Sequence, residues 1–254
     1  MRLCRAQTVT PDHRSLAEVS PTQRSWNTDV LPTGTAKAQA VQSMFDAIAP
    51  RYDVVNRIMT FRLDVRWRRT AVAALSLRRG STVLDLASGT GDLCRELERQ
   101  GQHPLSFDFS FGMLSADTSR VPRIQADALS LPVRTSSVDG ITCGFALRNF
   151  VELPRFFAEL ARTVRSGGRI AMLDVSVPDN PIIRAGNAVY FGKIVPLIGG
   201  LFSDRAAYRY LPRSVSYLPT PQEMCVMLES VGFQNVQHRQ LSGGLTQLLT
   251  ATRS

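Results

Sequence analysis

The stretch TVLDLASGTGDL, residues 82–93, constrains the fold of this 254-residue chain more than any other feature of the sequence. Its first six residues are mostly apolar, a pattern typical of a short strand that is buried on both faces of a parallel sheet. Gly89 and Gly91 follow, and a helix is expected to start at Gly91. Because glycines let the backbone approach a ligand closely, this order of strand, turn and helix predicts a nucleotide-binding turn in an α/β protein.

The chain after this turn continues to alternate between strands and helices. Further strands are predicted at residues 104–109, 123–127, 138–145 and 169–176. Apolar periodicity predicts one helix that stops at Gly167-Gly168 and a second over residues 221–233. Two final runs, 233–241 and 245–252, are joined by a serine-glycine-glycine turn and read as a hairpin. The alternation indicates a mostly parallel α/β sheet with right-handed crossovers.

The N-terminal part differs in composition from the region that follows it. Residues 1–36 are polar and rich in Pro, Ser, Thr and Gln, so we expect a disordered tail before a single domain over residues 37–254. Two helices are predicted within residues 39–78, and Pro50 should end the first of them. Residues 178–219 interrupt the alternation and are interpreted as an insertion on the substrate side.

The charge and the reactive residue types exclude several classes of function. The four cysteines form no CxxC pair and only three histidines occur, so neither a disulfide framework nor a protein-built metal centre is expected. The chain has no apolar run of about 18 residues, and we expect a cytoplasmic protein without a membrane-spanning helix. The net charge of +9 favours an anionic partner, either nucleic acid or a membrane face, although solvated surface arginines would give the same charge.

Acidic residues at the strand ends indicate which nucleotide the turn binds. Asp108 ends the second predicted strand, where a carboxylate can accept both hydroxyls of a ribose. Cys94 stands where a dinucleotide fingerprint needs its third glycine, and no P-loop motif is present, so NAD and P-loop nucleotides are excluded. Asp85, just before the turn, suits a ligand with a cationic end. These features point to S-adenosylmethionine, an adenosine that carries a sulfonium.

Two further residues fit the same pocket, each with a structural alternative. Asp127 ends the third predicted strand, where its carboxylate and the next backbone N–H could contact the adenine edge, but it could also cap a helix. Met113 lies on the predicted helix after Asp108 and could pack either on the adenine face or in the core.

Six longer segments resemble the UbiE/MenG family of quinone-biosynthesis C-methyltransferases, within the class I S-adenosylmethionine-dependent methyltransferases. They are MFDAIAPRYDVVNRIMTFRLDVRW (44–67), VLDLASGTGDL (83–93), FDFSFGML (107–114), GFALRNF (144–150), RTVRSGGRIAMLDVS (162–176) and YRYLPRSV (208–215). The resemblance implies a Rossmann-like α/β fold with a mostly parallel seven-stranded sheet, a C-terminal antiparallel hairpin and helices on both faces. It also implies S-adenosyl-L-methionine as methyl donor and a prenylated quinol, such as demethylmenaquinol, as substrate.

The resemblance places the family's cofactor contacts on Thr90, Asp108, Asp127 and Ala128. Its serine before the LRN segment is Gly144 here. The candidate cofactor-binding residues are therefore Asp85, Gly89, Thr90, Gly91, Asp108, Met113, Asp127, Ala128 and Gly144. Other departures concern the substrate, since Asp64 replaces the family's usual histidine and Asp174 its usual glutamate. They leave open another small aromatic or lipid substrate for the same cofactor.

The resemblance also suggests which residues carry the chemistry. Methylation of an aromatic carbon requires that the charge of a neighbouring, deprotonated hydroxyl be stabilised. Arg148 is the candidate for this role because its guanidinium stays protonated, although a salt bridge alone would also explain it. Asn149 is expected to supply orienting hydrogen bonds or simply to cap a loop, and Asp174 to hold a hydroxyl or pair with Arg148. Tyr52 would cover the methionine end of the cofactor or simply pack in the core.

The most apolar segment, residues 186–202, belongs to the predicted insertion. It is too short to span a bilayer, and it could shape a channel for a polyprenyl tail and rest on the inner face of the membrane, or form a lid packed on the core. A non-catalytic, RNA-associated protein is the remaining alternative, but the chain carries no RNA-binding module. Nucleic acid is therefore not the expected partner, and the oligomeric state is left open.

Overall fold

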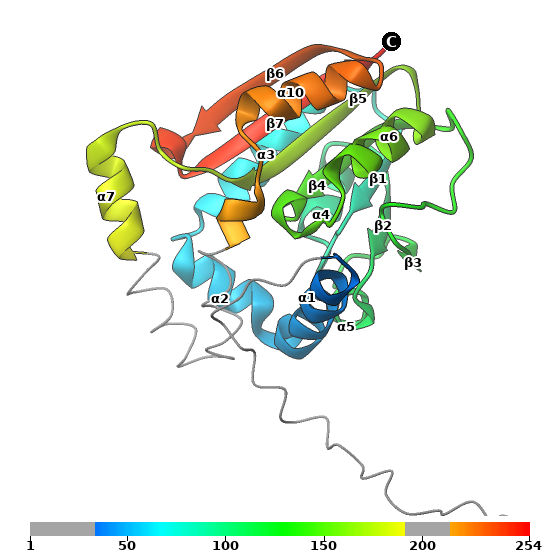
Figure 1. Cartoon of the computed structure of the whole chain (residues 1–254). Coiled ribbons are helices and arrows are strands. Elements are labelled where there is room, and N and C mark those ends of the chain that lie inside the picture. Colours follow the sequence, from blue (N-terminus) through cyan, green and yellow to red (C-terminus); the bar gives the residue numbers. More distant parts are fainter. Residues whose placement is uncertain (1–33, 191–213) are drawn as a thin grey trace, which may run out of the picture.

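A seven-stranded sheet forms the centre of the computed structural model, which describes residues 34–190 and 214–254 (Figure 1). The strand order is β3-β2-β1-β4-β5-β7-β6. Strands β3, β2, β1, β4 and β5 run parallel to one another, whereas β7 is antiparallel to both β5 and β6. The strands are β1 (Thr82–Leu86), β2 (His103–Asp108), β3 (Arg123–Gln125), β4 (Val138–Gly144), β5 (Val164–Val175), β6 (Phe233–Leu241) and β7 (Thr246–Arg253). The predicted Rossmann-like sheet with its C-terminal hairpin is confirmed.

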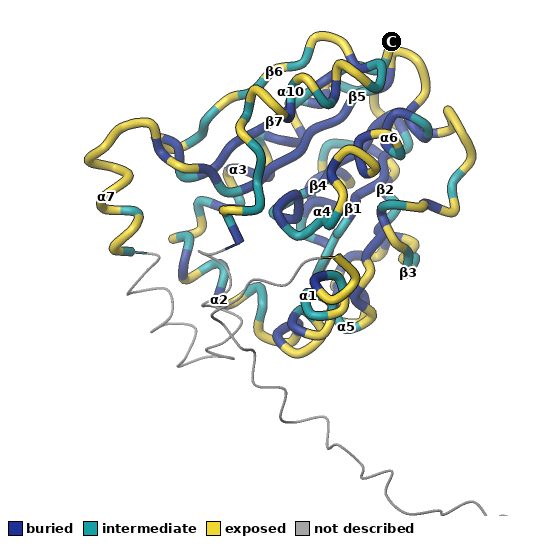
Figure 2. Tube along the Cα trace, in the orientation of Figure 1, coloured by how far each residue is buried: buried dark blue, intermediate teal, exposed yellow. Residues whose placement is uncertain are grey.

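Helices cover both faces of this sheet. The α-helices of the described residues are α1 (Gly34–Ile48), α2 (Tyr52–Met59), α3 (Leu63–Leu75), α4 (Asp92–Arg99), α5 (Phe111–Ala116), α6 (Leu153–Thr163), α7 (Pro181–Val189) and α10 (Pro221–Ser230). Alternate residues of β1 point to opposite faces: Leu84 and Leu86 pack with α6 and α10, whereas Val83 packs with α3 and α4. Strands β1, β2, β4 and β7 and the second half of β5 are accordingly mostly buried, whereas the edge strands β3 and β6 are largely exposed or half-buried (Figure 2). Burial on both faces explains why the central strand β1 is mostly apolar.

The N-terminal region differs from the prediction. Helix α1 already includes Gly34, before the predicted start at residue 39, and Lys37 in this polar stretch makes buried contacts with the body of the protein. The rest of the predicted tail, residues 1–33, lies outside the described residues. Within the described part of the chain, three α-helices precede β1 instead of two, since Phe61 and Arg62 adopt positive φ angles (50° and 62°) that separate α2 from α3.

A second difference concerns the end of α6. The helix ends at Thr163 and β5 begins at once, so that Gly167-Gly168 lies within the strand and not between helix and strand. Val164 already pairs with Val138 of β4 before the register shifts. A β-branched residue favours this extended conformation, although its spacing from the preceding apolar residues also fits a helix. The predicted hairpin is present, with β6 and β7 joined through Ser242–Gly244.

Candidate functional site

Two adjacent cavities lie at the carboxyl ends of the parallel strands. The first, of about 150 Å³, is lined by residues that follow β1, β2, β3 and β4 and by part of α1. The second, of about 760 Å³, is lined by α2, α3, α7 and the residues after β5. Tyr52 and Phe145 line both cavities. Because ligands of open α/β sheets bind at this edge, the two cavities are candidate cofactor and substrate sites.

Asp108, the last residue of β2, is fixed at the wall of the first cavity by backbone N–H groups. Its Oδ2 accepts a hydrogen bond from Gly89 (2.8 Å) and its Oδ1 accepts one from Ser110 (2.8 Å). Gly89 has a φ of 59°, which glycine adopts without strain. Burial raises the pKa of Asp108 to about 6, and these backbone hydrogen bonds oppose the shift. A carboxylate offers about four acceptor sites, so this one can still bind hydroxyl groups.

The structure brings four further predicted residues to the same cavity: Met113, Asp127, Ala128 and Gly144. Asp127 is exposed, and its Oδ1 accepts the backbone N–H of Leu129 (2.9 Å) within a turn. No helix follows this turn, so the alternative that Asp127 caps a helix is wrong. At Gly144 an added Cβ would lie 2.9 Å from Cδ1 of Leu93, so a serine at this position would require the Leu93 side chain to shift.

Three other predicted cofactor residues, Asp85, Thr90 and Gly91, do not line either cavity. Asp85 is fully buried and accepts a hydrogen bond from Thr142 Oγ1 (2.8 Å), and burial raises the pKa of Asp85 to about 7. Gly91 has a φ of 80°, and a Cβ at this position would lie 2.1 Å from Oδ1 of Asp117. Asp85 therefore lies in the core next to β4, and Gly91 lies beside Asp117, both outside the lining of the two cavities.

Arg148, in the turn after β4, lines the second cavity and is held by three partners. Its guanidinium forms an ion pair with Asp174 and donates to the Phe145 carbonyl (2.7 Å) and to Ser214 Oγ (3.0 Å). Asp174 is fully buried, also accepts the backbone N–H of Arg148 (3.2 Å), and does not line the cavity. The predicted pairing of Asp174 with Arg148 is thus confirmed. Asn149 lines the first cavity, not the second.

Phe145 forms a wall common to both cavities, although no sequence motif marks it as a site residue. It has a φ of 61°, and a bulky residue in this region of conformational space is strained. Its ring lies 6.2 Å from the Trp67 ring and 5.4 Å from the Arg68 guanidinium, between centres. Strain of this kind is commonly found at ligand sites. The signal in the sequence is its place between the end of β4 and the LRN turn, from which only Ala146 separates it.

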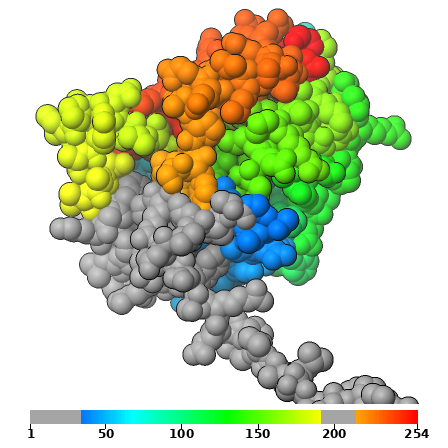
Figure 3. Space-filling view, viewed as in Figure 1, coloured from blue at the N-terminus to red at the C-terminus, as the bar shows by residue number. Residues whose placement is uncertain are grey.

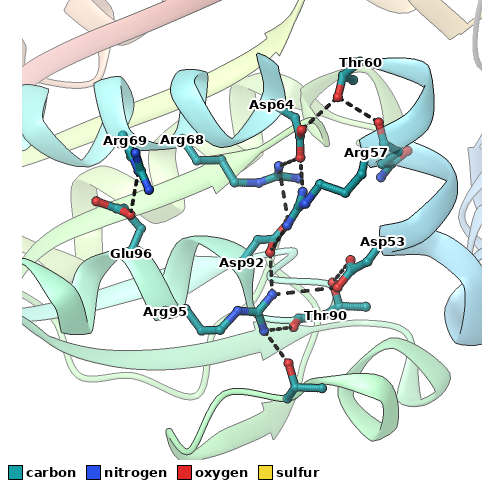
Figure 4. Close-up of polar contacts among 12 residues, drawn as sticks. Asp53, Arg57, Thr60, Asp64, Arg68, Arg69, Thr90, Asp92, Arg95 and Glu96 are labelled. Atoms are coloured by element: carbon teal, nitrogen blue, oxygen red, sulfur yellow. Dashed lines mark hydrogen bonds and ion pairs between the residues drawn. The ribbon is translucent and has the colours of Figure 1, made fainter. Parts of the chain in front are cut away.

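An ion-pair cluster connects the second cavity to the glycine turn (Figure 4). It comprises Asp53, Arg57, Asp64, Arg68, Asp92 and Arg95. Asp64, on the wall of the second cavity, is paired with both Arg57 and Arg68. Arg57 also binds Asp92 (2.7 Å), the first residue of α4. Three carboxylates and three guanidinium groups balance in charge, so the cluster accommodates a buried Asp64 and ties α2 and α3 to α4.

The glycine turn is held by the same cluster at its other end. Arg95 donates to the carbonyl oxygen of Thr90 (2.8 Å), and the Thr90 hydroxyl donates to Asp53 on α2.

Within residues 34–190 and 214–254, no His, Cys, Asp and Glu side chains are grouped so that they could hold a metal ion. In the same ranges, no helix combines the length and apolarity that crossing a membrane requires.

Comparison with known proteins identifies relatives of the chain. A model of the ubiE/COQ5 methyltransferase family matches residues 33–253. The chain is 37% identical over 223 residues to the ubiquinone/menaquinone biosynthesis C-methyltransferase UbiE of Geotalea uraniireducens, covering 83% of this chain and 95% of that protein. It is 37% identical over 235 residues to the demethylmenaquinone methyltransferase of Roseiflexus castenholzii, covering 89% of this chain and 99% of that protein.

A solved structure supports the fold. The phosphoethanolamine N-methyltransferase 2 of Haemonchus contortus, in complex with phosphomonomethylethanolamine and S-adenosylhomocysteine, is similar with a TM-score of 0.54. The match covers 72% of this chain and 52% of that one at 12% sequence identity. At this identity the likeness concerns the fold alone.

Proposed function

The chain belongs to the ubiE/COQ5 methyltransferase family, and we propose that it transfers a methyl group from S-adenosylmethionine to a ring carbon of a prenylated quinol such as demethylmenaquinol. It is an S-adenosylmethionine-dependent C-methyltransferase of quinone biosynthesis. One observation supports the proposal more than any other. The first cavity, which Asp108 lines, adjoins the larger second cavity, which is lined by the buried side chain of Arg148. Tyr52 and Phe145 line both cavities.

The wall of the first cavity fits S-adenosylmethionine. When bound, this cofactor supplies an electrophilic methyl group. Asp108 would accept both ribose hydroxyls, because two backbone N–H groups already fix the direction of its carboxylate. The adenine would be contacted by Met113, Asp127 and Ala128. Gly89 leaves the backbone of the turn open to close approach at the same wall.

The affinity for S-adenosylmethionine is expected to be nearly constant above about pH 7 and to fall below about pH 6. The pKa of Asp108 is raised to about 6, so the carboxyl gains a proton in this range and loses acceptor sites for the ribose. Calorimetric titrations between about pH 5 and 8 measure this dependence. In Asp108→Asn the residue no longer titrates, so its residual affinity should vary much less across the acid range. An equally steep fall in that variant would assign the dependence to another group.

Arg148 is the proposed catalytic residue in the second cavity. The ring carbon of a quinol becomes nucleophilic when the neighbouring hydroxyl loses its proton, and the enzyme must stabilise the resulting charge. Asp174, Ser214 and the Phe145 carbonyl hold the guanidinium in one orientation, so little reorganisation is needed when the charge develops. Asp174 acts by positioning Arg148 and not by contact with substrate. Asn149 lines the first cavity, where it would help to orient the bound cofactor.

The lining of the second cavity suits an aromatic ring that carries an apolar tail. Its apolar residues include Met59, Phe61, Leu63, Trp67, Val175 and Ile183. The test is a comparison of kcat/KM for demethylmenaquinol, for the same quinol without its prenyl tail, and for unrelated small phenols. The proposal predicts the highest value for the prenylated quinol, mainly through a lower KM. A higher value for a tail-free phenol would instead favour another small aromatic substrate.

Exposed apolar side chains on two segments that line the second cavity, the α2–α3 turn and α7, favour contact with a membrane surface. Phe61 and Ile182 are 75% and 81% exposed, and α7 contains no buried residue. This helix projects at one edge of the molecule, away from the sheet (Figures 1 and 3). Arg62 and Arg184 are exposed on the same segments. In contact with a membrane, Phe61 and Ile182 would lie among the lipid headgroups, and Arg62 and Arg184 would pair with anionic lipids. Only the start of the predicted apolar segment 186–202 is among the described residues.

The Phe61→Ser/Ile182→Ser variant is expected to bind vesicles that contain anionic lipid at least about tenfold more weakly than the parent, because two apolar side chains no longer leave water on binding. Co-sedimentation with the vesicles measures the difference. Val226, which is 63% exposed on α10, offers the matched control Val226→Ser. Equal weakening by that control, or no binding by the parent, would contradict the membrane contact.

A further inference from the structure

The ammonium group of Lys37 connects three segments that are distant in the sequence. Lys37 lies near the start of α1 and is only 4% exposed. Its Nζ donates to the carbonyl oxygens of Arg148 (2.9 Å) and Phe150 (3.0 Å). It also lies 3.7 Å from the centre of the Tyr217 ring. Lysine is rarely buried this far unless it is specifically paired, so the arrangement points to a defined role.

Helix α1, which carries Lys37, forms part of the wall of the first cavity. The wall residues of this helix are Ala38, Val41, Gln42 and Phe45. Two later residues of the helix fasten it on the β2 side of the cavity. Gln42 donates to the Phe109 carbonyl (3.1 Å), and Asp46 accepts the backbone N–H of Gly112 (2.8 Å). Lys37 makes the corresponding attachment on the β4 side, so α1 is fixed at both sides of the cavity.

The segment that Lys37 holds contributes to both cavities. Arg148 lines the second cavity, and Asn149 and Phe150 line the first. The two carbonyl groups that accept from Lys37 lie on either side of Asn149 along the chain. Charge-assisted hydrogen bonds and the aromatic face replace part of the water that the ammonium loses. Burial lowers the pKa of Lys37 to about 8, so the group remains mostly protonated near neutral pH.

We propose that Lys37 is a positioning residue that fastens α1 over the cofactor cavity and, through the same contacts, sets the position of Arg148 and Asn149. Retention of the cofactor and placement of the catalytic guanidinium then depend on one side chain. The inference rests on the proposed methyl transfer and adds to it a residue that touches neither ligand cavity directly.

The test compares Lys37→Met with Gln39→Met, which alters an exposed position of the same helix. The full chain is titrated with S-adenosylhomocysteine, and stopped-flow mixing gives the dissociation rate. We expect Lys37→Met to bind at least about tenfold more weakly, mainly through faster dissociation, and Gln39→Met to match the parent. Tyr217→Leu should shift affinity in the same direction but less. It replaces Lys37→Met if that variant does not fold.

A double-mutant cycle with Arg148→Lys distinguishes positioning from a purely structural role. The readout is the single-turnover rate of methyl transfer at saturating cofactor. If Lys37 acts through the Arg148 segment, the two substitutions should be clearly non-additive, since they disturb the same group. Additive losses, or a Lys37→Met variant within about twofold of the parent in both affinity and rate, would overturn the inference. A parent chain that binds no S-adenosylhomocysteine would instead contradict the proposed function.

Discussion

Replacing Arg148 with alanine is expected to slow methyl transfer by about 10²–10³-fold, while the affinity for S-adenosylmethionine changes by less than about tenfold. The guanidinium lines the larger cavity and is buried, so it acts on a developing phenolate where solvent screening is weak. It does not line the cofactor cavity, which explains the small expected change in affinity. Single-turnover kinetics at saturating cofactor measure the chemical step separately from product release.

The same substitution leaves Asp174 buried without its cation. Breaking a buried ion pair typically costs about 3–5 kcal/mol, so Arg148→Ala should lower the free energy of unfolding by an amount in this range. The double variant Arg148→Met/Asp174→Asn removes both charges and should recover much of this stability, but not the rate. A stable double variant that transfers methyl groups within about tenfold of the parent rate would contradict the catalytic role.

The substitution Asp108→Ala is expected to weaken the binding of S-adenosylmethionine by at least about 100-fold, or roughly 3 kcal/mol. It removes the acceptor for the ribose hydroxyls and also leaves the N–H groups of Gly89 and Ser110 without their partner. Asp108→Asn keeps the shape and one acceptor oxygen, so an intermediate loss of about tenfold is expected. Calorimetry on the three proteins measures these affinities. Similar affinities for all of them would place the ribose elsewhere.

Much of the fold could be predicted because its determinants are local. The apolar strands, the break at Pro50 and the final hairpin follow from patterns within a few residues. The start of α1 could not be predicted in this way, because Lys37 lies in a polar stretch and is ordered by carbonyl groups more than a hundred residues away. The break between α2 and α3 depends on positive φ angles at Phe61 and Arg62, residue types that do not indicate such a turn.

In the functional site too, some features follow from the local sequence and others depend on the tertiary structure. Asp108 and Gly89 were predictable because a strand end and a glycine turn place them at the ligand edge of the sheet. The direction of Asp85 could have been foreseen from the alternation of β1, which puts Leu84 and Leu86 on one face and Asp85 on the other. The partners of Asp64 could be anticipated only in part. Arg68 is one helical turn away, whereas the link to α4 through Arg57 requires the tertiary structure.

The most direct test of the proposed methyl transfer is to incubate the protein with S-adenosylmethionine labelled in its methyl group and with demethylmenaquinol, and to locate the label by mass spectrometry and NMR. The label is expected on the ring carbon of the quinol, in a one-to-one ratio with S-adenosylhomocysteine. Arg148→Ala is expected to form the same product at a much lower rate. Label on an oxygen atom, or no transfer by a parent protein that binds the cofactor, would contradict the proposed function.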